Sequence, residues 1–250
     1  MNRAAVRFYG ETNDLLPAPL RQRTLATGFD GPASVKAVIE ACGVPHTEVD
    51  FVLVNGTPAT LSTIVEDGDR LAVFPRFRLL EPDPGDRLLP EPLAEPRFAL
   101  DVHLGRLAGY LRLAGFDTAY RNDYSDPELA WLSHREDRTL VTRDRELLKR
   151  AIVTRGYWIR STQPRRQFAE VVRHFGLERN LRLFTRCARC NCVLEAVSKG
   201  EVSKRLPPRV ERSVDRFLRC PGCDRVYWEG THVERIRLFI RLALEEPEPS

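Results

Sequence analysis

The sequence predicts an α/β protein built from more than one domain, and three observations support this. From residue 97 onward, predicted strands alternate with helices, which is typical of a parallel sheet in a three-layer domain. The first 80 residues follow the order strand, helix, strand, strand of a small α+β domain. Two Cys-x-x-Cys pairs near the C-terminus indicate a metal-binding ribbon. The predicted parts are an N-terminal domain (1–80), a linker (81–96), an α/β domain (97–180), a zinc ribbon (181–240) and a tail (241–250).

The elements of the N-terminal domain are expected at 4–10 (strand), 32–43 (helix), 50–56 (strand) and 63–75 (strand). The helix should end near Gly43, and the Asn55-Gly56 pair should turn the chain after the second strand. This order, with VNG followed by DGDRLAVFP, resembles the ubiquitin-like β-grasp sulfur carriers of thiamin and molybdopterin synthesis. Those carriers need a C-terminal Gly-Gly, whereas the last strand here runs into FPRF. We therefore predict a scaffold or a docking module for a protein partner.

The linker, EPDPGDRLLPEPLAEP, contains five prolines in sixteen positions. Proline fixes φ and removes a backbone donor, so this segment should be an extended, semi-rigid connector. We expect it to hold the N-terminal domain away from the rest of the chain. The last six residues, EEPEPS, should be disordered.

The α/β domain should contain strands at 97–101, 116–122, 139–144 and 156–161 and helices at 104–115, 126–135, 145–151 and 164–175. Leu104, Leu107, Ala108 and Leu111 recur at helical spacing, and Gly115 should end that helix. In parallel sheets of this kind, ligands bind at the carboxyl ends of the strands.

Three acidic residues are predicted at that edge. Asp101 and Asp144 each end a strand, and Asp126 should cap a helix. Carboxylates there suit Mg²⁺ or Mn²⁺, which can activate water and stabilise the leaving oxygen of a phosphodiester. The alternative is that Asp126 and Asp144 are only helix caps and Asp101 only a turn residue. Arg143, beside Asp144, is either a phosphate ligand or a solvated surface residue.

Two Cys-x-x-Cys turns are separated by 29 residues, and together they predict one structural zinc ion with a closed four-thiolate shell. The four predicted ligands are Cys187, Cys190, Cys220 and Cys223. A redox Cys-x-x-Cys is the competing interpretation, and Cys192 is either an alternate ligand or a spare thiol. The intervening segment is basic and includes Pro207-Pro208, so it should have little apolar mass of its own. Metal binding should then supply much of the folding free energy of the ribbon.

Charge is concentrated in the second half of the chain. From Arg143 to Arg225 there are 21 basic and 9 acidic residues, which favours a polyanionic partner such as nucleic acid. The alternative is a general preference for arginine, since only four of the 39 basic residues are lysine. Tyr227 and Trp228 could stack on bases or could support the cysteine turns.

The composition is that of an ordinary globular protein, with 42% hydrophobic and 30% charged residues. This excludes a mainly disordered chain, and no apolar run approaches the roughly 18 residues of a membrane span. The N-terminus lacks the apolar region of a signal peptide, so we expect a reducing cytoplasm. In that compartment the six cysteines are better explained as metal ligands than as disulfides.

The stretches LDVHLGRLAGYLRLAGFDTAY, SDPEL, LVTRDRELLKRA, RCARCNCVLEAV and FLRCPGCDRVYWEGTH together resemble the Mut-seven C-terminal RNase family. That family joins a PIN-type nuclease domain to a zinc ribbon, and bacterial members carry a ubiquitin-like N-terminal domain. The resemblance implies that Asp101, Asp126 and Asp144 bind a divalent metal for RNA hydrolysis. PIN nucleases often have a fourth acid after the next strand, which here ends in Ser-Thr, so Asp123 or Glu128 could contribute instead.

The sequence thus favours a metal-dependent ribonuclease whose ribbon aids RNA binding. Its rival is a non-catalytic RNA-binding adaptor with a degenerate PIN domain, which the missing fourth acid favours. A DNA nuclease is a third option.

Overall fold

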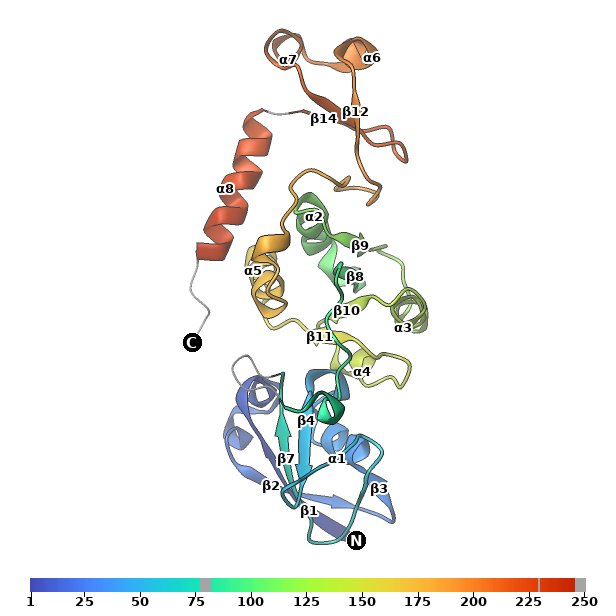
Figure 1. Ribbon diagram of the computed structural model, residues 1–250, viewed down its shortest axis with the longest axis vertical. Coiled ribbons are helices and arrows are strands. Elements are labelled where there is room, and N and C mark those ends of the chain that lie inside the picture. Colours follow the sequence, from blue (N-terminus) through green and yellow to red (C-terminus); the bar gives the residue numbers. More distant parts are fainter. Residues whose placement is uncertain (77–81, 229, 246–250) are drawn as a thin grey trace. The chain divides into compact units, whose positions relative to one another are not determined.

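The computed structural model describes residues 1–76, 82–228 and 230–245. The chain forms two compact units, each considered by itself: unit 1 comprises Met1–Glu95 and Ser125–Trp158, and unit 2 comprises Pro96–Tyr124 and Ile159–Ser250 (Figure 1). In the described ranges, no helix combines the length and the apolar character that a membrane crossing needs. Of the predicted tail, residues 246–250 lie outside the described residues, as does residue 81 of the linker.

The N-terminal part of unit 1 is a five-stranded sheet in the order β2-β1-β7-β4-β5, covered by one helix (Figure 1). Its elements are β1 (Asn2–Phe8), β2 (Thr24–Phe29), α1 (Val35–Ala41), β4 (Phe51–Val54), β5 (Thr57–Pro58) and β7 (Arg70–Phe74), with a small pair of β3 (Ala33–Ser34) and β6 (Ile64–Val65). β1 is parallel to β7 and antiparallel to β2. The β-grasp fold is confirmed, but β2 was not predicted.

Local sequence explains these elements. Ser34 is the N-cap of α1, because its hydroxyl accepts a hydrogen bond from the Ala37 N–H at 3.2 Å. Asn55 and Gly56 both have positive φ, 51° and 87°, as the tight turn between β4 and β5 requires. One face of the sheet and α1 bury a continuous apolar core that includes Phe8, Ile39 and Val73.

The second part of unit 1 contributes α3 (Asp126–Arg135), β10 (Thr139–Thr142), α4 (Arg145–Leu148) and β11 (Gly156–Trp158). β10 and β11 pair in parallel. This part contacts the N-terminal domain directly. The buried ring of His46 binds the Val153 carbonyl through Nε2 at 2.9 Å, the Glu48 carboxylate accepts the Trp158 N–H, and Arg145 donates to the Leu15 carbonyl at 2.6 Å.

The linker does not hold the N-terminal domain away, which corrects our expectation. Asp50, which is fully buried, accepts the Leu89 N–H through its carboxylate at 3.1 Å, while its carbonyl accepts the Leu88 N–H at 2.8 Å. Arg76 donates to the Pro90 carbonyl at 2.9 Å. Asp50 thus accepts the N–H groups of two adjacent linker residues, and the linker lies along the domain.

Unit 2 begins with β8 (Arg97–Leu100), the short turn η5 (Val102–Leu104), α2 (Gly105–Leu113) and β9 (Asp117–Ala119), and β8 and β9 pair in parallel. Gly115 ends α2 with φ +101°, and a Cβ there would collide with the Arg182 carbonyl. α5 (Pro164–His174) packs between α2 and α8 (Thr231–Glu245), where Phe239 lies 4.3 Å from the Tyr110 ring centroid. α8 therefore extends five residues beyond the predicted end of the ribbon.

The ribbon, residues 181–240 of unit 2, contains the antiparallel sheet β12 (Glu195–Val197), β13 (Phe217–Arg219) and β14 (Val226–Trp228). Two short helices, α6 (Lys199–Val202) and α7 (Pro208–Ser213), lie between β12 and β13. The expectation of little apolar mass in this segment is wrong. Val202, Leu206 and Phe217 form a small buried cluster against which further valines and Trp228 pack.

Candidate functional site

The four predicted cysteine ligands come together at one point of the ribbon, with their sulfur atoms all within 4.8 Å of one another. Two Sγ–Sγ pairs are closer still, Cys187–Cys223 at 3.5 Å and Cys190–Cys220 at 3.2 Å. Zn–S bonds of about 2.3 Å in a tetrahedron separate the sulfurs by about 3.8 Å, so the group has the size of a zinc shell. These cysteines could hold a metal ion such as zinc.

The two cysteine turns share one hydrogen-bond pattern. The Cys187 N–H bonds to the carbonyl five residues on, and the N–H of Asn191 returns to the Cys187 carbonyl. In the second turn, Cys220 bonds in the same way to Arg225, and Asp224 returns to Cys220. Asn191 and Asp224 have positive φ, 72° and 58°, which Asn and Asp tolerate best among residues with a side chain. Sequence reasoning missed these two residues, although Asn or Asp directly after the second cysteine was visible.

The thiols have unlike acidities before any metal binds. Burial opposes ionisation of Cys187, but hydrogen bonds from the Tyr227 hydroxyl and from backbone N–H groups lower its pKa to about 6. Burial raises the pKa of Cys190 and of Cys220 to about 11. The Tyr227 hydroxyl lies 3.1 Å from the Cys187 sulfur and 3.1 Å from the Ala188 nitrogen. Tyr227 therefore supports the first turn, which is one of the two roles left open for it.

A buried arginine anchors the first turn to α2 and β9. Arg112, only 4% exposed, donates to the Arg189 carbonyl at 2.7 Å and to the Thr118 carbonyl at 2.9 Å. Burial lowers its pKa, while the nearby cysteines and Asp117 favour the charged form. Asn191 adds a second link, because its amide donates to the Asp117 carboxylate at 2.8 Å and accepts the Thr118 N–H at 3.0 Å.

Cys192 lies beside this group rather than within it. A Cβ at Gly222 would approach the Cys192 sulfur to 2.5 Å, so a larger residue at that position of the second turn would displace the Cys192 side chain. Cys42 is far away in sequence and bonds to Thr27 in the N-terminal domain, where burial raises its pKa.

The predicted acidic residues are distributed over both units. Asp101, only 8% exposed, is the N-cap of η5 in unit 2, whereas Asp126 and Asp144 are exposed in unit 1. The expected capping role of Asp126 is wrong, because Ser125 is the N-cap of α3 and Asp126 is its first residue. Asp144 does cap α4, its carboxylate accepting the Glu146 N–H at 2.8 Å.

The turn around Asp144 is fixed by further contacts within unit 1. The Thr142 hydroxyl accepts the Asp144 N–H at 2.9 Å. The Trp158 indole donates to the Arg143 carbonyl at 3.2 Å, while the Arg143 side chain is exposed. Since Trp158 also packs against the core of the N-terminal domain, that domain supports the backbone that carries Arg143 and Asp144.

The candidate fourth acids are engaged elsewhere. Asp123 pairs with Arg121 at 2.8 Å, a hydrogen bond that lowers the pKa of its carboxyl. Glu128 accepts the Ser125 N–H at 2.8 Å in a capping box. At the end of the predicted strand 156–161, Glu170 of α5 accepts the N–H groups of Arg160 and Ser161 at 2.7 and 3.0 Å.

Two family models match the chain. The one described as Mut7-C RNAse domain matches residues 96–240, and the one described as Mut7-C ubiquitin matches residues 1–81. No curated protein matches the sequence. Among solved structures, small archaeal modifier protein 1 of H. volcanii is 23% identical over 31% of this chain and 100% of that chain, with a TM-score of 0.25.

Proposed function

The chain belongs to the family of the Mut7-C RNAse domain, and from that premise we propose that it is a metal-dependent ribonuclease that hydrolyses RNA phosphodiester bonds. The observation that carries the proposal is that the matched range, 96–240, includes Asp101, Asp126, Asp144 and the four-cysteine group. We further propose that the ribbon holds a structural zinc ion and aids RNA binding, and that the protein acts in the reducing cytoplasm, where thiolates remain available to zinc.

The proposed catalytic residues are Asp101, Asp126 and Asp144. Because Ser125 and Glu128 form the capping box of α3, the carboxylate of Asp126 is not needed as the N-cap of that helix. Mg²⁺ or Mn²⁺ bound by these carboxylates would activate water and stabilise the leaving oxygen. Arg143, exposed beside Asp144, would hold the scissile phosphate in place by charge-assisted hydrogen bonds.

We expect Asp126→Asn to lower RNA cleavage on the order of 100-fold, the scale on which loss of a group that stabilises the transition state is felt. Its melting temperature should stay unchanged, because the cap of α3 is intact. Asp144→Asn should behave alike, since Asn also serves as an N-cap. Asp30→Asn, at another exposed acid of the same unit, is the matched control. Full activity of Asp126→Asn and Asp144→Asn would refute the assignment.

A non-catalytic RNA-binding adaptor is the second candidate, and the engagement of Asp123, Glu128 and Glu170 in other contacts favours it. Labelled RNA and DNA of the same sequence, incubated with and without Mn²⁺, separate the candidates. The ribonuclease cuts RNA only when Mn²⁺ is present, whereas the adaptor binds RNA in both buffers and cuts neither strand. Cleavage of DNA alone would identify a DNA nuclease.

A further inference from the structure

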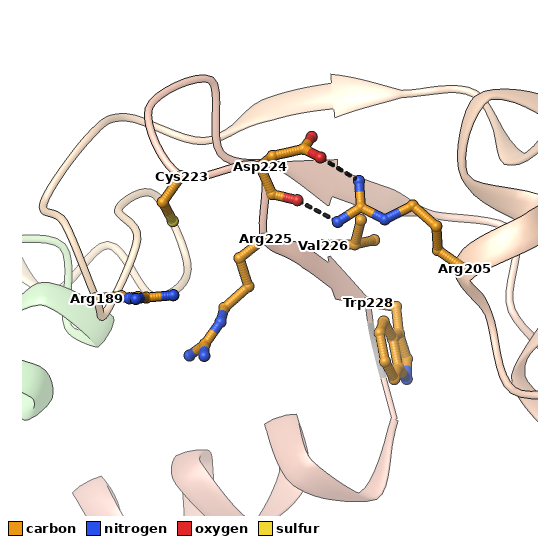
Figure 2. A pocket seen from close by; sticks show the side chains of 7 residues that line it. All are labelled: Arg189, Arg205, Cys223, Asp224, Arg225, Val226 and Trp228. Atoms are coloured by element: carbon orange, nitrogen blue, oxygen red, sulfur yellow. Dashed lines mark hydrogen bonds and ion pairs between the residues drawn. The ribbon is translucent and has the colours of Figure 1, made fainter.

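The ribbon contains a pocket of about 360 Å³ beside the cysteine group, within the size range of small-ligand sites. It is lined by arginines, by the second cysteine turn and by one aromatic ring (Figure 2). The lining residues are Arg189, Arg205, Cys223, Asp224, Arg225, Val226 and Trp228. We propose that this pocket binds one nucleotide unit of single-stranded RNA, with the base on Trp228 and the phosphate between Arg189 and Arg225.

The charges of the pocket favour an anion. Arg205 donates to the Asp224 carboxylate at 2.9 Å and also to its backbone carbonyl, so the acid in the lining is already neutralised. Arg189 and Arg225 are both exposed, and neither forms an ion pair with a described residue. Figure 2 shows Arg225 extending toward Arg189, with the indole of Trp228 standing across the pocket. Two guanidinium groups can thus reach one phosphate.

Both arginines are carried by backbone that the cysteine turns hold rigid. The Arg225 carbonyl accepts the Cys220 N–H at 2.9 Å, and the Arg189 carbonyl accepts a bond from buried Arg112 at 2.7 Å. Binding a phosphate therefore orders only side chains, which lowers the entropic cost of binding.

Trp228 has the position of a stacking platform. It is half-buried at the end of β14, where it packs against the cluster of Val202, Leu206 and Phe217 and also lines the pocket. An indole supported on one side by a core and open on the other can stack on any base, so the pocket should be tolerant of sequence.

The test measures how a fluorescein-labelled oligouridylate of twelve nucleotides binds to the full zinc-loaded chain. Binding is measured by fluorescence anisotropy in buffer without Mg²⁺ or Mn²⁺. We expect Trp228→Leu to weaken binding about fivefold or more, through lost stacking. Arg225→Gln should weaken binding and reduce the slope of log K against log[salt] by about 0.7, the contribution of one phosphate contact on a single strand. Trp131→Leu and Arg209→Gln, at an exposed tryptophan of unit 1 and an exposed arginine of α7, should bind as the parent does.

Unchanged affinity in both pocket variants at full zinc content overturns the inference. An equal loss of RNA affinity in the two control variants also overturns it, because the loss would then come from the change in net charge or in fold and not from the pocket. Loss of zinc without loss of RNA affinity in Arg225→Gln would overturn the assignment and mean that Arg225 only balances the thiolate charge. Binding of fluorescein-labelled polyglutamate without binding of the oligouridylate would overturn it in favour of an acidic protein partner. The inference rests on the proposed function only in taking RNA as the substrate. RNA binding that depends on Trp228, without any cleavage in Mn²⁺, would refute only the proposed catalysis. RNA cleavage by the parent chain, with the RNA affinity of the pocket variants unchanged, would refute only the proposed pocket.

Discussion

The N-terminal domain (1–80) and the ribbon (181–240) are two small folds with different kinds of core. The N-terminal domain has a continuous core of aliphatic and aromatic side chains between its sheet and α1. The centre of the ribbon has three buried residues, of which two are the cysteines Cys187 and Cys220, and a second small cluster lies around Phe217. The first core is apolar throughout, whereas the centre of the second consists largely of thiols that could hold a metal ion.

The chemistry of two of the four thiols bears on this difference. Burial raises the pKa of Cys190 and Cys220 to about 11, so without a metal these thiols remain protonated at neutral pH. A zinc ion bound by these cysteines would displace those protons and form Zn–S bonds in place of the S–H contacts. We therefore expect the ribbon to depend on metal in a way that the N-terminal domain does not.

Metal removal should have the largest effect, and it should destabilise the ribbon but not the N-terminal domain. Structural zinc contributes on the order of 10 kcal/mol in isolated zinc-finger peptides, so Cys220→Ser should lose zinc and unfold the cysteine turns. Hydrogen exchange should accelerate across residues 186–228 and stay slow in β1 and β7. The readouts are zinc content by mass spectrometry and segment-resolved exchange.

Cys42→Ser is the matched control, since this half-buried thiol lies in the N-terminal domain and should leave zinc content unchanged. Cys192→Ser tests the neighbouring thiol and should also retain zinc. Full zinc occupancy in a Cys220→Ser, Cys192→Ser double variant would refute the four-cysteine assignment.

Phe8→Ala is the converse test, because it removes an apolar side chain from the core of the N-terminal domain and leaves the ribbon unchanged. Phe8 is 1% exposed in the core of the N-terminal domain, and such truncations cost about 3–5 kcal/mol. We expect the urea midpoint of unit 1 to fall while zinc content stays at one ion per chain. Loss of zinc in this variant would show that the two folds unfold as one cooperative system.

Features of both folds that depend on adjacent residues were predictable from the sequence, whereas features that depend on distant residues were not. The sequence correctly predicted the helix ends at Gly43 and Gly115, the Asn55-Gly56 turn and the grouping of both cysteine pairs. Each of these features depends on a few adjacent residues. β2 was missed because its side chains alternate between exposed and half-buried and include Gly28, so it has little apolar pattern. The apolar cluster around Phe217 was missed because its members are scattered among charged residues.

The contacts of His46 and Glu48 had no local signal at all, since their partners lie 107 and 110 residues away. Both residues sit in a short turn that reads as ordinary polar loop sequence. The start of α3 is an intermediate case. Ser125 and Glu128 have the Ser-x-x-Glu spacing of a capping box, but the Asp-Pro pair that follows Ser125 led us to predict the cap one residue too late.

The smallest expected effect tests whether the N-terminal domain stabilises the segment that carries Asp144. Glu48, 8% exposed, accepts the Trp158 N–H, and the Trp158 indole in turn donates to the Arg143 carbonyl. Glu48→Ala leaves that N–H without its acceptor, which should cost about 1–3 kcal/mol in the free energy of unfolding of unit 1. Glu48→Gln keeps an acceptor oxygen and should recover most of the loss. Urea unfolding followed by Trp fluorescence gives the energy, and hydrogen exchange of residues 139–158 shows where it acts. Equal exchange in Glu48→Ala and the parent chain would mean that the Asp144 turn is stable without the N-terminal domain, and that the two parts of unit 1 are merely adjacent.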